Sequence, residues 1–149
     1  NSDAKIVEIY TRGLGYLPNA QKAVGLKPKD GGISMPLGKD VFVKACKYMP
    51  QSVEYLLNRR GLKFENLTYF IAHQANMRII SNIAKQYGIP DKKLLHNIAE
   101  LGNTGSVSSA LVYAQNAKKF KEGDLVAMTV FGGGYSTGAC LVSFTRCFI

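Results

Sequence analysis

The sequence predicts one α/β domain, and three features of its pattern support this. The run Tyr69–Ala72 is short, aromatic and β-branched, like a buried strand, and it passes through a polar cluster into a helix with one apolar stripe. Apolar residues recur with helical spacing over residues 41–57, and residues 125–131 form the nearly continuous apolar run of a fully buried strand. A strand that ends at polar residues and continues as a helix places side chains where α/β proteins usually bind ligands.

Size and composition are those of one ordinary globular domain. The chain has 149 residues, 46% of them hydrophobic, and no apolar run approaches the roughly 20 residues of a membrane span. No apolar segment follows the first five residues, so we expect a cytoplasmic protein without a signal peptide. The chain does not begin with Met, and we expect a processed or excised piece.

The charge of the chain favours an acidic partner. Lys and Arg number 19 against 10 Asp and Glu, a formal charge of +9. Nucleic acid, anionic lipid, phosphorylated cofactors and acidic carrier proteins all fit, and charge does not choose among them. No motif interleaves aromatic with basic residues, so nucleic acid is the weakest candidate.

The three cysteines, Cys46, Cys140 and Cys147, are an odd number without metal-site spacing. Cys46 falls in a helical pattern and Cys140 in a strand pattern. We expect buried free thiols in a reducing cytoplasm, and neither a disulfide nor a metal.

We expect residues 1–40 to be an irregular lead-in to a core at residues 41–149. Residues 6–10 are predicted as a strand, after which Gly and Pro interrupt the chain repeatedly. So long a loop is either functional or packed on something outside this chain. A helix is then predicted from Asp40 to Arg60, with Gly61 as its stop and Pro50 expected to kink or split it.

The later elements follow from the same rules. Asn76 is a good N-cap for the helix that ends at Gly88. We then predict a strand at residues 94–98, a polar loop at 100–106, a helix at 106–119 and strands at 125–131 and 137–144. The many Ala and Ser residues of the helix at 106–119 indicate close packing in the interior, and its apolar stripe is Val107, Ala110, Leu111, Ala114 and Ala117.

Three polar loops stand at the ends of predicted elements, at residues 73–76, 102–104 and 132–134. If the strands before them are neighbours, these loops converge, with His73 at the tip of the first. A His and an Asn amide aimed at one point can hold a carbonyl oxygen and stabilise the enolate left when a neighbouring carboxylate departs. The glycine run is no phosphate loop, since no Gly-Lys-Ser/Thr follows. Alternatively, His73 only caps a strand and makes local hydrogen bonds.

Several blocks of residues match a known family in order and spacing. They are residues 70–79, Asn97, residues 102–104, residues 123–125, residues 131–134, and Gly138 with Ala139. Together they resemble the carboxy-terminal half of 3-oxoacyl-[acyl-carrier-protein] synthase III. The resemblance covers residues 34–144, whereas residues 1–33 match poorly. It implies one half of a thiolase-like fold: a mixed five-stranded-type sheet, a buried helix layer and outer helices.

The resemblance also implies a mechanism. Enzymes of this family load an acyl group from coenzyme A onto a cysteine. A His and an Asn then promote decarboxylation of malonyl on the carrier protein, and the carbanion attacks the acyl-cysteine. His73 and Asn103 stand at the matching positions. Phe131 resembles the aromatic residue near the active centre, and backbone N–H groups near Gly133 or Gly134 are expected to form an oxyanion site.

Three further residues are expected to belong to this site. Asn76 is expected to line it beside His73. Arg78 and Lys85 match basic positions that face the carrier protein in this family, and, seven positions apart, they share one helical face. The alternative is a solvated charged face.

The nucleophilic Cys of the family has no counterpart here, because none of the three cysteines lies at the start of a buried helix. The chain resembles half of a two-part enzyme and is expected to be inactive alone. We expect as partners acyl carrier protein, acyl-CoA, a Cys-bearing amino-terminal half and, in the full enzyme, a second copy. We expect no bound cofactor, metal, nucleic acid or membrane. A non-catalytic or partner-completing half-domain, or a related synthase with other starters, are the alternatives.

Overall fold

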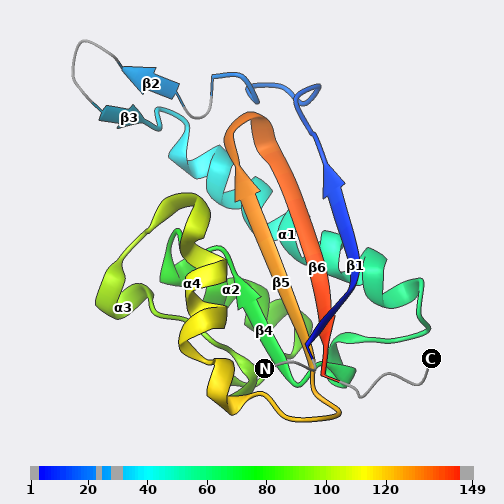
Figure 1. The fold of residues 1–149 in the computed structure, drawn as a ribbon. Helices are drawn as coiled ribbons and strands as arrows, with labels where there is room; N and C mark the ends of the chain where they lie inside the picture. The colour runs from blue at the N-terminus through cyan, green and yellow to red at the C-terminus, as the bar shows by residue number, and fades with distance from the viewer. Residues whose placement is uncertain (1–3, 23–24, 28–31, 145–149) are drawn as a thin grey trace.

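The computed structural model describes residues 4–22, 25–27 and 32–144 of the chain. Its centre is a mixed sheet whose strands lie in the order β1 (Lys5–Arg12), β6 (Ser136–Ser143), β5 (Leu125–Gly132) and β4 (Tyr69–Ala72). β4 runs parallel to β5, whereas β6 is antiparallel to both β5 and β1 (Figure 1). A separate antiparallel pair consists of β2 (Gly25–Lys27) and β3 (Gly32–Ser34).

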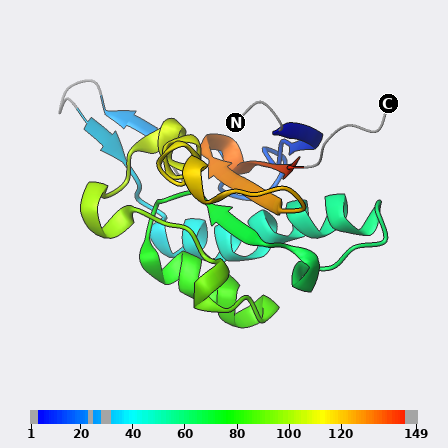
Figure 2. The same ribbon diagram turned by 60° about the horizontal axis from the view of Figure 1, so that its bottom comes forward.

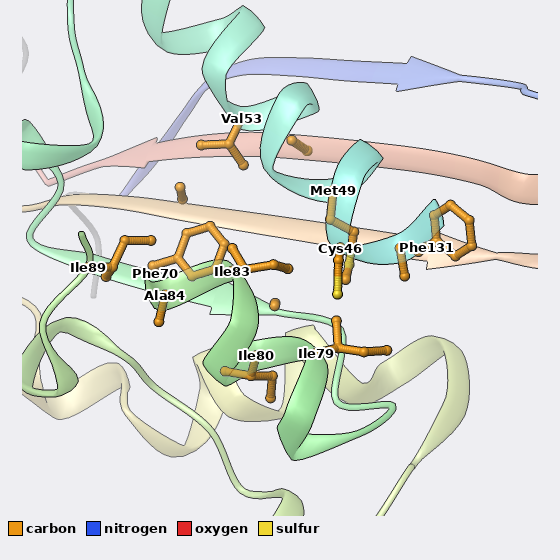
Figure 3. Packing of buried hydrophobic residues seen from close by; sticks show 14 of the residues in the cluster. Cys46, Met49, Val53, Phe70, Ile79, Ile80, Ile83, Ala84, Ile89 and Phe131 are labelled. Carbon is orange, nitrogen blue, oxygen red and sulfur yellow. The ribbon is translucent and has the colours of Figure 1, made fainter. Parts of the chain in front are cut away.

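Helices cover both faces of the sheet. α1 (Gly38–Asn58) and α2 (Met77–Tyr87) lie on one face and α4 (Ser108–Gln115) on the other (Figure 2). Successive side chains of β4 point to opposite faces. Phe70 packs in the larger core cluster with Val53 and Ile83 (Figure 3), and Ile71 packs in the smaller cluster on the α4 side. β4 is therefore buried from both sides.

Local signals in the sequence predicted the β4–α2 unit and the ends of its helix. The strand at residues 69–72 and the helix that follows it are confirmed. Asn76 is the N-cap of α2, and its Oδ1 accepts the backbone N–H of Arg78 at 2.8 Å. Gly88 ends the helix in the left-handed conformation, with a φ of 62°. The strand predicted at residues 6–10 is also confirmed, as the middle of β1.

Pro50 does not split α1, which runs through it as one helix of 21 residues. A proline in a helix interior removes one backbone hydrogen bond and costs about 3 kcal/mol. Met49 and Val53, on either side of Pro50, are fully buried against the sheet. Their burial offsets the cost of the proline, so the expected split is wrong.

Residues 94–98 do not form the predicted strand, and the described part of the sheet has four strands rather than five. A 3-10 turn, η2 (Asp91–Lys93), leads to a single parallel bridge between Leu94 and Phe70, and the short helix α3 (Ile98–Leu101) follows. At Asn97 the backbone N–H donates to the side chain of Gln74 at 3.0 Å. Because the side chain of Gln74, and not the backbone of β4, accepts this N–H, the pairing with β4 does not continue past Leu94 as a strand.

α4 buries a different side from the apolar stripe predicted for it. The helix is also shorter than predicted, with the 3-10 turns η3 (Gly105–Val107) and η4 (Ala117–Lys119) at its ends. Ser108, Ser109 and Val112 are buried, whereas Val107 is 57% exposed. The hydroxyl of Ser108 forms a hydrogen bond with His73, just after β4, and that of Ser109 with the carbonyl of Thr129 within β5. These polar contacts turn the serine side of the helix toward the sheet, and the apolar stripe faces outward.

The turn between β5 and β6 provides a test of the fold. Gly134, in the 3-10 turn η5 (Gly133–Tyr135), has a left-handed φ of 66°. Replacing it by Ala should lower the free energy of unfolding by about 1–2 kcal/mol, because a Cβ is disfavoured in that conformation. The matched control is Gly132→Ala, whose φ of −146° is extended and whose added Cβ would meet open space. Urea unfolding of both variants checks this, and equal losses would contradict it.

Candidate active site

His73 follows β4 directly, where the parallel pair β4–β5 ends. Its backbone N–H donates to the carbonyl of Thr129 in β5 at 2.8 Å. The buried hydroxyl of Thr129 lies 3.0 Å from the carbonyl oxygen of Met49 in α1 and 2.9 Å from that of Gly138 in β6. Backbone pairing of β4 with the inner strand β5 therefore sets the position of His73.

The imidazole of His73 is held from the α4 side. Its Nδ1 lies 2.7 Å from the hydroxyl oxygen of Ser108, the first residue of α4, which is fully buried. The backbone N–H of Gln74 donates to the same oxygen at 3.2 Å. Burial lowers the pKa of His73 below its usual value, so the ring is neutral at pH 7.

A buried amide network connects His73 to the loop that carries Asn103. Gln74 is completely buried; its Nε2 donates to the carbonyl of Ala72 at 2.7 Å, and its Oε1 accepts the N–H of Asn97. The side chain of Asn97 in turn donates to Oε1 of Gln115 in α4 at 2.7 Å. Gln74 and Ser108 are supporting residues that the sequence did not single out, because neither lies in an apolar stripe.

Asn103 lies on the exposed loop between α3 and η3. Its Oδ1 accepts the backbone N–H of Gly105 at 3.0 Å, and Gly102 and Gly105 adopt left-handed φ values of 64° and 67°. This turn uses the oxygen of the amide, while Nδ2 has no hydrogen-bond partner in the described part of the chain. The side chain therefore presents a free N–H donor.

One cavity of about 720 Å³ brings the predicted loops together. His73, Asn103, Phe131 and Gly133 all line it, from the ends of β4, α3 and β5. Its apolar walls come from α1 and α2 and include Val41, Ala45, Met49 and Ile79. Two neutral hydrogen-bonding side chains thus face a largely apolar space, in which electrostatic interactions are stronger than in water.

Two residues predicted for the site do not line this cavity. The side-chain oxygen of Asn76 caps α2, and Gly134 lies one residue beyond the lining of the turn. Arg78 and Lys85 lie on the exposed surface of α2, as expected for either a binding face or a solvated one. Lys85 also lines a second, smaller cavity with Ser81 and His96.

The glycine turn is anchored by a buried tyrosine that the sequence did not single out. Tyr135 has a left-handed φ of 55°, and its hydroxyl donates to the carboxylate of Asp40 in the first turn of α1. Burial and this hydrogen bond raise the pKa of Tyr135 to about 12. The ring of Tyr135 also stacks on Phe131, with centroids 5.7 Å apart. The turn is therefore attached to the same helix that forms a wall of the cavity.

The amino-acid sequence matches a known protein family over the part of the chain that carries this site. Residues 57–144, which include both His73 and Asn103, match the family described as 3-Oxoacyl-[acyl-carrier-protein (ACP)] synthase III C terminal. The chain belongs to this family.

Individual members of the synthase III family agree with this assignment. The chain is 39% identical over 109 residues to beta-ketoacyl-[acyl-carrier-protein] synthase III of Limosilactobacillus reuteri, an alignment that covers 72% of this chain and 34% of the relative. The chloroplastic synthase III B of Cuphea wrightii is 39% identical over 107 residues, which are 70% of this chain and 27% of that protein. The chain thus spans about a third of the length of these curated relatives.

Solved structures confirm the thiolase-like α/β fold. The crystal structure of 3-oxoacyl-[acyl-carrier-protein] synthase III from Aquifex aeolicus matches with a TM-score of 0.85 and 30% identity, over 95% of this chain and 45% of that one. OleA from Xanthomonas campestris shares the fold, with a TM-score of 0.83 at 19% identity, over 95% of this chain and 41% of OleA. The structural likeness therefore extends beyond residues 57–144 into the lead-in.

Neither of the two described cysteines of this synthase III family member lines the cavity. Cys46 is buried in α1 and Cys140 is partly buried in β6. Burial raises the pKa of both thiols, which disfavours the reactive thiolate. Cys147 lies outside the described residues. The described residues also contain no cluster of three potential metal ligands and no helix long and apolar enough to cross a membrane.

The lowered pKa of His73 predicts an acid-dependent loss of stability. Below about pH 6.5 the unfolded chain binds a proton at this histidine, whereas the folded chain does not until its lower pKa is reached. The free energy of unfolding should therefore fall as the pH falls below 6.5, and this contribution should level off below the folded pKa. Urea unfolding between pH 7.5 and 5 measures it. His73→Gln should flatten the pH dependence, whereas the exposed control His96→Gln should keep it; equal slopes would contradict the assignment.

Proposed function

We propose that the chain is the His/Asn-bearing half of a decarboxylating condensing enzyme. In this proposal the complete enzyme joins an acyl group from a coenzyme A thioester to malonyl-acyl carrier protein in fatty-acid or related polyketide synthesis. The observation that carries the proposal is that His73 and Asn103, 30 positions apart in the sequence, line one apolar cavity. Membership of the synthase III family supports it, and residues 1–149 would act as a single domain.

The two side chains suit the decarboxylation step. When the carboxylate of a malonyl thioester leaves as carbon dioxide, the electrons of the broken C–C bond move onto the thioester oxygen. Neutral donors from His73 and Asn103 would stabilise that enolate oxygen, and the apolar walls would strengthen both hydrogen bonds. The enolate carbon would then attack an acyl-cysteine thioester and release the cysteine thiolate. The coenzyme A thioester is the substrate of the earlier acyl-loading step, and decarboxylation needs no cofactor or metal.

The nucleophilic cysteine would come from an amino-terminal half that docks on the α4 side. That side of the chain exposes apolar groups, since Val107 is 57% and Val130 42% exposed. Apolar surface of this kind is typical of a face that another domain covers. We infer that the chain alone has no thioester turnover and that the complete enzyme is a homodimer.

The proposal is tested by pairing the chain with a Cys-bearing amino-terminal half. In the complete enzyme, His73→Ala and Asn103→Ala should each lower kcat for malonyl decarboxylation by about 10²- to 10³-fold, because each removes one donor to the enolate oxygen. Acyl loading from coenzyme A onto the cysteine should stay nearly unchanged. Release of carbon dioxide and mass spectrometry of the acyl-enzyme measure the two steps separately.

Two results would contradict the proposal. One is equal loss of loading and decarboxylation in folded variants, which would indicate a structural role for both residues. The other is measurable condensation by the chain alone, which would require a nucleophile within it.

We also propose that Arg78 and Lys85 bind the acidic carrier protein. Both side chains are exposed on α2, whose first turn lies beside the cavity. Changing both residues to Glu should weaken carrier binding by at least about tenfold and leave acyl loading intact, because like charges would then face each other. Binding is measured at moderate salt. The control is the double change of Lys118 and Lys121 to Glu, which alters the net charge equally at the other end of the sheet. Equal weakening in the control would show that only net charge matters.

A further inference from the structure

The buried hydroxyl of Ser108 lies between two nitrogen atoms. The backbone N–H of Gln74 donates to Oγ at 3.2 Å, since a backbone nitrogen cannot accept. Nδ1 of His73 lies 2.7 Å from the same oxygen. Ser108 is fully buried and has no further hydrogen-bond partner for its side chain among the described residues. Its single proton therefore has one available acceptor, which is Nδ1.

The two neutral tautomers of His73, Nδ1–H and Nε2–H, differ in whether the Ser108 proton finds an acceptor. If Nδ1 carried the proton, Oγ of Ser108 would accept two N–H groups and its own proton would remain buried without an acceptor, which destabilises that form. If Nε2 carries the proton, the hydroxyl donates to Nδ1 and every group is satisfied. His73 lines the cavity whereas Ser108 does not, so the ring edge opposite Nδ1 is the one that faces the cavity.

We propose that Ser108 is a positioning residue that holds His73 as the Nε2–H tautomer, with its donor directed into the cavity. Gln74 completes the arrangement, because its N–H occupies the lone pair of Oγ that would otherwise accept from Nδ1. The inference deepens the proposed function and rests on it for its catalytic meaning, since an enolate oxygen requires a donor at Nε2. The tautomer itself can be measured without turnover.

The same contact disfavours the imidazolium. A charged ring has protons on both nitrogens, so the Ser108 proton would again lose its acceptor. This agrees with the lowered pKa that burial gives His73. A second buried serine on α4 offers a matched control: Ser109 bonds to the carbonyl of Thr129 at 3.5 Å instead of to the ring.

The tautomer is read from long-range ¹H–¹⁵N spectra of the ¹⁵N-labelled chain at neutral pH. Only two histidines are present, so His96→Gln assigns the signals of His73. We expect an unprotonated ¹⁵N shift for Nδ1 and a protonated shift for Nε2. A protonated Nδ1 in the unsubstituted chain would overturn the proposal, and this result requires no serine variant to fold.

Variants of the serines then test the cause. Ser108→Ala should populate the Nδ1–H tautomer measurably and raise the pKa of His73 by about half a unit to one unit, the worth of one hydrogen bond. Ser108→Thr, which keeps the hydroxyl, should restore both values, and Ser109→Ala should match the unsubstituted chain. The same tautomer and pKa in folded Ser108→Ala would overturn the proposal.

Activity of the complete enzyme separates this inference from the proposed function. Ser108→Ala should lower kcat for decarboxylation by roughly threefold to tenfold and shift the acid limb of its pH profile upward. If the complete enzyme does not decarboxylate malonyl-carrier protein while the chain shows the Nε2–H tautomer, the proposed function fails and the assignment of Ser108 stands. If decarboxylation is normal and the tautomer is Nδ1–H, the assignment of Ser108 fails and the condensing activity stands, with the enolate oxygen stabilised without a donor at Nε2 of His73.

Discussion

The parallel pairing of β4 with β5 is the contact on which the site depends. The N–H of His73 completes this ladder at the carbonyl of Thr129, so the histidine cannot move without breaking a backbone hydrogen bond. Thr129 also links its strand to α1 and β6 through its buried hydroxyl. A rigid sheet therefore positions the reactive side chain, and the order of the strands decides which loops can approach it.

The residues that hold His73 are polar and buried, so their hydrogen bonds fix the position of the imidazole. Gln74, Asn97 and Ser108 lie in the interior, and the folded chain would lose stability if any of them lost its hydrogen bonds. The polar atoms around the loop that carries Asn103 are less completely hydrogen-bonded. Two buried atoms without a hydrogen-bond partner among the described residues, Oδ1 of Asn97 and Oγ1 of Thr104, both belong to residues 97–104. Of the two proposed donors, His73 is therefore held by more hydrogen bonds than Asn103.

The uneven covering of the sheet agrees with a chain that spans about a third of its curated relatives. α1 and α2 bury one face thoroughly, whereas α4 is short and turns its apolar stripe outward. The apolar cavity opens among residues from several elements and contains no cysteine of the described chain. A second structural unit over the α4 face would both cover that stripe and approach His73, which is the physical basis for the proposed two-part enzyme.

The sequence by itself determined the elements whose signals are local. The aromatic strand at residues 69–72, the Asn76 cap and the Gly88 stop could all be predicted, because each depends on neighbours within a few positions. The pattern also predicted that the loops with His73 and Asn103 would converge, and both residues line one cavity, although the strand expected before the second loop is absent from the described residues. Only the tertiary structure decided that residues 94–98 form no strand, that α1 continues through Pro50 and which side of α4 is buried. It alone paired His73 with Ser108 and Tyr135 with Asp40, 35 and 95 positions apart, because hydrogen bonds at such separations leave no periodic trace in the chain.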